Sequence, residues 1–252
     1  MLLLSDIHGA FGALAAVAKR GETLLILGDF LNFLDYRTLE GMVTDELGIE
    51  FAADIAEFRR TGDYTAARHA WGSAFEASEL DLREAFLVRA RAQYVAAASA
   101  LEGAKGYATY GNVDLPELLA EHLPPGVAFM DAAVVEIEGL SVGFVGGATV
   151  SAFMGGKRVT EDEMAERLAL IGDVDVLCTH VPPAVRPLRT DVVTGRQERA
   201  SVAIADYLSD HRPAFHYFGD VHQPQAIEWR VGDTLCRNVG YFRATGRPVR
   251  HE

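Results

Sequence analysis

Short apolar runs of strand length alternate with helical patterns over much of the chain. The runs at residues 2–4 and 23–27 flank a stretch, 11–20, whose apolar positions recur at helical spacing. A strand, a helix and a second strand in this order predict a right-handed parallel crossover. Further apolar runs of strand length lie at residues 106–110, 174–178 and 214–218. The pattern therefore predicts an α/β fold with a largely parallel sheet.

Smaller signals complete this outline. Two pairs of short apolar segments, each joined at a glycine, predict β-hairpins at residues 134–145 and 226–238. A helix is predicted over 161–171, because Thr160 and Glu163 have the spacing of a capping box. Another helix is predicted over 199–210, and Pro116 is expected to open a short one.

The region from residue 30 to about 106 has a different pattern. Strand signals are absent, and amphipathic helical patterns occur at residues 51–60, 64–78 and 80–101. The region holds no proline, so its glycines, Gly48 among them, are the available breaks. We predict a helical insertion within a single domain of residues 1–252. It is expected to act either as a cap that shapes a pocket beside Asp29 or as a packing or dimerisation surface.

Side chains with metal-binding atoms follow five of the predicted strands. They are Asp6 and His8, Asp29, Asn112, His180, and Asp220 and His222. One Asp-x-His pair is equally consistent with a turn that caps a helix. Five successive strand ends are different, because the carboxyl ends of strands are where α/β sheets place their sites. At three of these ends a glycine precedes the polar residue and allows a sharp turn.

The number and type of these side chains predict the chemistry. Seven oxygen and nitrogen ligands exceed the needs of one tetrahedral zinc and suit two divalent cations that share a carboxylate. Two cations about 3.5–4 Å apart can hold a phosphate, activate water and stabilise an in-line displacement. The sequence therefore predicts metal-assisted hydrolysis of a phosphate ester.

The charge and the apolar content of the chain restrict the classes of partner that it is expected to bind. The formal net charge of −13 argues against long nucleic acids and acidic membrane surfaces, but it does not exclude a nucleotide. The expected partner is a small phosphate ester or a nucleotide. No apolar run approaches the about 18 residues of a membrane span, and a cytoplasmic protein is expected. Cys178 and Cys236 fit neither a disulfide framework nor a zinc motif, and Cys178 is expected to be buried and inert. The oligomeric state is not predicted.

The series Asp-x-His, Gly-Asp, Gly-Asn-x-Asp, His-x-Pro-Pro and Gly-x-x-His resembles the calcineurin-like metallophosphoesterases. The resemblance covers nearly the whole chain except the helical insertion, and the segment from Asn238 to Gly240 is similar to the closing loop of that family. It implies a sandwich of two β-sheets flanked by helices, with the site at one edge.

The resemblance also implies a division of ligands between two metals. It assigns to the first metal Asp6, His8 and His222, to the second metal Asn112 and His180, and to both, as a bridge, Asp29. It places the catalytic residue Asn112 against the phosphate of the substrate as well. The implied nucleophile is a hydroxide between the metals, so that no protein nucleophile is required.

Two positions depart from the family pattern. Val113 stands where the family usually has a histidine that assists the leaving group, which predicts slow hydrolysis of alkyl phosphates. Asp220 replaces the first of two histidines, and its anionic oxygen favours Mn or Fe over Zn, although Zn remains a candidate.

Three functions are compatible with these residues: a phosphodiesterase or phosphomonoesterase, a catalytically weak scaffold that binds a protein partner, and a helical interaction module. Val113 favours the scaffold, whereas the presence of the other ligand types favours the enzyme. Diesters are the expected substrates. Candidate side chains for the substrate pocket are Tyr36, Arg37, Trp71, Arg186 and Arg189.

Overall fold

The structure is a computed structural model that describes residues 1–77, 81–149 and 158–251. Its strands are β1 (Leu2–Leu4), β2 (Leu24–Leu27), β3 (Gly106–Thr109), β4 (Val127–Phe129), β5 (Ala133–Ile137), β6 (Leu140–Val145), β7 (Val176–Thr179), β8 (Phe215–Phe218), β9 (Glu228–Val231), β10 (Thr234–Asn238) and β11 (Val249–Arg250). Its helices are α1 (Phe11–Ala18), α2 (Met42–Thr61), α3 (Tyr64–Ala77), α4 (Leu82–Ala100), α5 (Pro116–His122), α6 (Glu161–Ile171), α7 (Arg186–Arg189), α8 (Val202–His211) and α9 (Phe242–Thr245).

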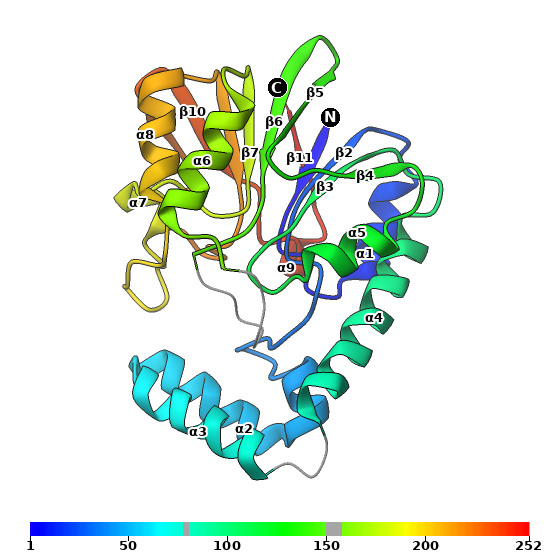
Figure 1. Ribbon diagram of the computed structural model, residues 1–252, viewed down its shortest axis with the longest axis vertical. Coiled ribbons are helices and arrows are strands. Elements are labelled where there is room, and N and C mark those ends of the chain that lie inside the picture. The colour runs from blue at the N-terminus through cyan, green and yellow to red at the C-terminus, as the bar shows by residue number, and fades with distance from the viewer. Residues whose placement is uncertain (78–80, 150–157, 252) are drawn as a thin grey trace.

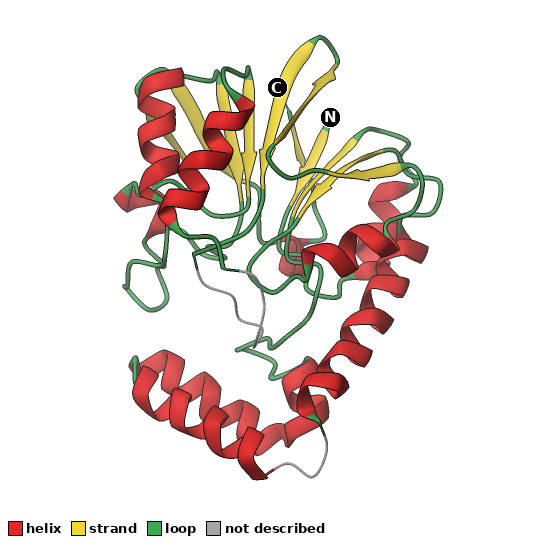
Figure 2. Ribbon diagram, viewed as in Figure 1, coloured by secondary structure: helices red, strands yellow, loops and turns green. Residues whose placement is uncertain are grey.

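The strands form two sheets with helices on either side (Figure 2). The first sheet has the order β11-β1-β2-β3-β4, in which β1 to β4 run parallel and β11 runs antiparallel to β1. The second has the order β5-β6-β7-β8-β10-β9, with its four inner strands parallel and an antiparallel strand at each edge. The predicted parallel crossover from β1 to β2 is confirmed.

Alternate residues of the strands point to different cores, as the two-residue period of a strand requires. Leu2 and Leu4 face α1 and α4 on the outer side of the first sheet, whereas Leu3 lies between the sheets. Phe144 and Cys178 of the second sheet meet Leu3 in this inner layer. Both faces of each sheet are therefore buried, which explains why the strands are continuous apolar runs. The predicted sandwich of two sheets flanked by helices is confirmed.

The helical insertion lies largely apart from the sheets (Figure 1). The helices α2 and α3 pack against each other, and α4 runs back to the sandwich, where it packs on α1 and α5. Gly48 kinks α2, since its φ of 85° and ψ of 164° lie outside the helical region. Trp71 of α3 packs against Phe33, Phe51 and Phe86, and gives the insertion an aromatic core of its own.

Some details differ from the sequence-based expectations. The strands β4 and β11 were not expected, because two or three residues are too few to show a period and depend on pairing with β3 and β1. The helix expected from residue 199 begins at Val202, because the hydroxyl of Ser201 accepts from the N–H of Ile204 and caps it. The capping box of α6 is confirmed.

The two cysteines are buried, as expected for Cys178. Burial raises the pKa of the Cys178 thiol far above its usual range and that of Cys236 to about 12, so both are protonated. In the part of the chain that the structure describes, no helix has the length and apolarity needed to cross a membrane.

Candidate metal centre

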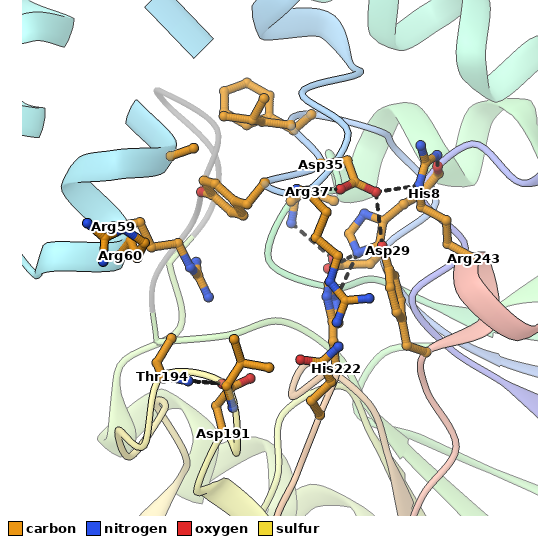
Figure 3. Close-up of a pocket in the computed structure, with 18 of the residues that line it drawn as sticks. His8, Asp29, Asp35, Arg37, Arg59, Arg60, Asp191, Thr194, His222 and Arg243 are labelled. Atoms are coloured by element: carbon orange, nitrogen blue, oxygen red, sulfur yellow. Dashed lines mark hydrogen bonds and ion pairs between the residues drawn. The ribbon is translucent and has the colours of Figure 1, made fainter. Parts of the chain in front are cut away.

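All seven predicted ligand residues lie at one edge of the sandwich, where strands of both sheets end. The first sheet contributes the loops after β1, β2 and β3, and the second contributes the loops after β7 and β8. Figure 3 shows His8, Asp29 and His222 together in the cavity at this edge. Segments up to 214 residues apart in sequence are thereby brought within contact distance.

A first group of ligand atoms surrounds Asp6. Nε2 of His222 lies 3.6 Å from Oδ1 of Asp6 and 3.2 Å from Nε2 of His8. One ligand atom from each of these three residues falls within 4.8 Å of the other two. This is the trio that the resemblance assigns to the first metal.

A second group surrounds His180. Asp29 and Asp6 each offer an oxygen within 4.8 Å of its imidazole nitrogen, and Oδ1 of Asp220 lies 3.8 Å from Nε2. The amide of Asn112 donates to Oδ1 of Asp220 at 3.3 Å. Asp220, which the sequence analysis left without a partner metal, thus belongs with Asn112 and His180.

Asp29 stands between the two groups. Its Oδ2 lies 3.5 Å from Nε2 of His8, and its Oδ1 lies 3.5 Å from Nε2 of His180. Each carboxylate oxygen therefore faces a histidine of a different group. Oδ1 also accepts from the backbone N–H of Val113 at 3.1 Å, which fixes the rotation of the carboxylate.

Backbone carbonyls orient two of the imidazoles. Nδ1 of His8 lies 3.0 Å from the carbonyl of Leu31, and Nδ1 of His180 lies 2.8 Å from the carbonyl of Leu27. A carbonyl only accepts, so Nδ1 carries the proton in each ring and Nε2 faces the cluster. A metal-binding imidazole usually has its other nitrogen held in this way.

Unsatisfied buried atoms test whether this cluster fits metal ions. Among the described residues, the buried side-chain atoms without a hydrogen-bond partner include Oδ2 of Asp6, Oδ1 of Asn112 and Nε2 of His180. An unpaired buried polar atom costs about 1–3 kcal/mol. All three are ligand-type atoms within the two groups. Cations coordinated there would satisfy them, and the donor set of carboxylate, amide and imidazole fits divalent metals.

The electrostatics indicate the same need for positive charge. Burial, together with the charges of Asp114, Asp6 and Asp220, raises the pKa of Asp29 well above its usual range. Burial lowers the pKa of His180, but Asp29, Asp220 and Asp6 outweigh it and raise this pKa to about 9. The carboxylates thus hold a proton on His180 in the protein alone, and a divalent cation would replace that proton.

The backbone at the site is unusual. Asp6, His8, Asp29 and Asp220 have positive φ, at 59°, 40°, 59° and 66°. Each such residue costs about 1 kcal/mol, and strain of this kind concentrates at functional sites. Gly111 provides the room, because a Cβ there would collide with Oδ1 of Asp29.

Asp114 is a positioning residue whose role the sequence analysis missed. Its buried carboxylate accepts from the N–H groups of Asp29, Phe30 and Gly111, at 2.7, 3.0 and 3.0 Å. It also accepts from the hydroxyl of Tyr94 on α4 at 3.2 Å. Asp114 therefore fixes the loops of Asp29 and Asn112 relative to the insertion. The sequence signal that could have revealed this role is the position of Asp114 two residues after Asn112, within the Gly-Asn-x-Asp motif.

A cavity of about 540 Å³ opens on the metal centre. Its walls include Tyr36 and Arg37, as expected, and Ala53, Ala56 and Arg59 of α2. The insertion thus shapes a pocket beside Asp29, as the cap interpretation of its role predicts.

Three of the candidate pocket residues are elsewhere. Trp71 is in the aromatic core of the insertion, Arg186 is exposed outside the cavity, and Arg189 donates to the carbonyl of Glu198. The expectation that they line the pocket is wrong, because their own elements direct them away from it.

Comparisons with known proteins support the fold. No family model and no curated protein matches the chain. One solved crystal structure is similar with a TM-score of 0.59 and 13% identity, over 96% of this chain and 90% of its own. TT1561 of Thermus thermophilus is similar with a TM-score of 0.51 and 12% identity, over 96% of this chain and 89% of its own. At these identities the similarity shows the architecture alone.

Proposed function

We propose that this protein is a calcineurin-like metallophosphoesterase, a dinuclear-metal-dependent hydrolase whose substrates are small phosphodiesters. The observation that carries the proposal is the carboxylate of Asp29, whose two oxygens each lie 3.5 Å from a histidine of a different ligand group. A carboxylate in this position suits a ligand shared by two cations. Coincidental acidic clusters have no reason to place orienting carbonyls behind both imidazoles.

The protein's own groups would then bind and orient the reactants. When bound, two divalent cations would supply a nucleophile from water and neutralise the charge that develops on the phosphate. Asn112 offers an unpaired Oδ1 toward a cation, and of its two amide N–H groups one donates to Asp220, which leaves the other for a phosphate oxygen. The carbonyls of Leu31 and Leu27 keep the two imidazoles in the ligand tautomer.

Val113 determines which leaving groups suit the site. Its side chain lines the cavity beside Asn112 and is only 7% exposed. An aliphatic group cannot donate a proton, so this position gives the departing alkoxide no assistance. We therefore expect better turnover of esters with acidic leaving groups, such as aryl phosphates, than of alkyl esters.

Asp220 influences the choice of metal. It supplies a carboxylate oxygen to the group of Asn112 and His180, at 3.3 and 3.8 Å. Oxygen-rich ligand sets favour Mn²⁺ or Fe²⁺ over Zn²⁺. We expect greater activation by Mn²⁺ than by Zn²⁺, and a clear preference for Zn²⁺ would refute the role given to Asp220.

Hydrolysis of bis-p-nitrophenyl phosphate and p-nitrophenyl phosphate, with and without Mn²⁺, tests the proposed function. The expected result is Mn²⁺-dependent turnover, faster on the diester, that Asp29→Asn reduces to background. Asp206→Asn is the matched control, because this exposed carboxylate on α8 lies outside the cavity. Both variants remove one negative charge.

A scaffold that binds a protein partner is the second candidate, and Val113 is the observation that favours it. Aryl leaving groups scarcely need a general acid. Absence of turnover of either ester with Mn²⁺, Fe²⁺ or Zn²⁺ would therefore contradict the hydrolase and support the scaffold.

A further inference from the structure

The cavity extends well beyond the metal centre. From His8 and Asp29 it reaches to α2 on one side and to the loop of Asp191 and Thr194 on another. Figure 3 shows Arg59 and Arg60 on the far side of the cavity from His8. Its volume of about 540 Å³ falls in the range of sites that hold whole small molecules, and exceeds what one phosphate group fills.

Four arginines line this cavity in a chain whose formal net charge is −13. They are Arg37, Arg59, Arg60 and Arg243. Two of them are engaged by carboxylates: Arg243 contacts Asp35 at 2.8 Å and Glu40 at 2.6 Å, and both donors of the Arg60 fork contact Glu57. These two serve the structure of the walls.

The other two are available to a ligand. Arg37 is exposed, and its guanidinium has no ion pair within the described part of the chain. The Arg59 guanidinium lies 4.5 Å from the ring centroid of Tyr36. Its ion pair is a long one, 3.6 Å to Glu198, and its side chain is 47% exposed. Contact with Tyr36 orients the Arg59 guanidinium, whose five N–H donors exceed those that Tyr36 and Glu198 occupy.

The acidic groups of the same walls are engaged with partners other than the guanidinium of Arg37. Asp35 and Glu57 are paired with Arg243 and Arg60. Asp191 accepts from the N–H groups of Val193 and Thr194, at 2.9 and 2.8 Å, so its carboxylate is hydrogen-bonded within its own loop. With Glu198 paired to Arg59, Arg37 is the arginine of these walls whose guanidinium has no carboxylate partner in the described part of the chain.

We infer that Arg37 and Arg59 bind a second anionic group of the substrate, while the phosphate to be cleaved lies at the metal centre. This inference rests on the proposed hydrolase function. It defines the substrate class as small phosphate esters with a second phosphate or a carboxylate, separated from the first by the width of the cavity. Guanidinium forks suit the planar and tetrahedral oxyanions of both kinds.

A matched pair of chromogenic nucleotides tests the inference in the presence of Mn²⁺. One is thymidine 5′-(p-nitrophenyl phosphate), and the other carries an additional 3′-phosphate. The wild-type kcat/KM should be at least about tenfold higher for the second compound, since bonds to a charged group are the strong ones. Arg37→Ala and Arg59→Ala should each lower this preference, and the double variant should abolish it.

The controls separate charge from shape. Arg37→Lys retains the charge and should keep part of the preference, and Arg247→Ala, at an exposed arginine outside the cavity, should keep all of it. Inhibition by propane-1,3-bisphosphonate and 3-phosphonopropionate, each compared with propylphosphonate, identifies the second group as phosphate or carboxylate.

The outcomes distinguish a failure of the proposed hydrolase function from a failure of the inferred second anion-binding site. Absence of turnover of either nucleotide by the wild type overturns the proposed function and this inference with it. Turnover without a preference for the 3′-phosphate overturns the inference alone. A preference for the 3′-phosphate that survives in the double variant also overturns the inference alone.

Discussion

The metal-bearing edge of the sandwich and the helical insertion are built in different ways. At the edge, Asp6, Asp29 and His180 are almost completely buried, and each lies one or two residues after the end of a paired strand. The insertion contributes Arg59 and Arg60 from α2, and both side chains are exposed. Exposed polar contacts open more readily than buried ones. The comparison shows that the residues proposed for the reaction lie on the buried edge of the sandwich, whereas the residues proposed for substrate recognition lie on the more exposed helical insertion.

Two contacts join these parts in different ways. Tyr94 of α4 donates to the buried carboxylate of Asp114, which in turn holds the loop of Asp29. Half-buried Arg196 donates to the carbonyls of Arg59 and Thr61, at 3.1 and 2.8 Å, at the end of α2. The first contact supports the loop that carries the metal ligand Asp29. The second joins the end of α2, in the insertion, to the loop that holds Arg196.

Replacing Asp114 should have the largest effect. Asp114→Ala leaves the N–H groups of Asp29, Phe30 and Gly111 without their acceptor and frees the ligand loops. Loss of such support typically lowers metal affinity about 10–100-fold. Isothermal titration with Mn²⁺ should record this loss, and thermal unfolding should show a lower Tm. Tyr94→Phe removes one bond to Asp114 and the acceptor of the Leu115 N–H, and should cost about 1–3 kcal/mol of stability. Unchanged Mn²⁺ affinity in Asp114→Ala would contradict the positioning role.

Placing an acid at position 113 should have the next largest effect. Val113→His should raise turnover of alkyl phosphates by up to about 100-fold, because general-acid assistance contributes about 10²–10⁴-fold and an introduced group is imperfectly placed. Aryl phosphates should gain little. The measurement is the ratio of kcat for an alkyl and an aryl ester. Val113→Phe supplies bulk without a proton and should show no gain. An unchanged ratio in Val113→His would refute the assignment.

Loosening the cap should have the smallest effect. Arg196→Ala removes two exposed hydrogen bonds at the end of α2, and should raise KM a few-fold while Mn²⁺ affinity is unchanged. Hydrogen exchange should become faster in α2 and remain unchanged in β1 and β2. Arg230→Ala is the control, an exposed arginine on the β9 hairpin. If Arg196→Ala weakened Mn²⁺ binding as much as Asp114→Ala, the division between the two parts would be wrong.

Much of the site was predictable because its signals are local. Each ligand follows an apolar run directly, and the glycine before Asp29, Asn112 or Asp220 shows where the chain must turn. The strands themselves were recognisable because burial on both faces leaves a continuous apolar run. The insertion was recognisable by its change of period, and its aromatic core explains why Trp71 resembled a pocket residue in the sequence yet packs inside.

The sequence by itself determined most of the strands, the helical insertion and the seven ligand-type residues at the strand ends, because these depend on periods and spacings within one segment. Only the tertiary structure decided the rest. It placed Asp220 with His180, turned the two oxygens of Asp29 toward different histidines, and brought Arg59 of α2 across from the metal centre. These relations depend on how distant segments pack, and no pattern within a single segment records them.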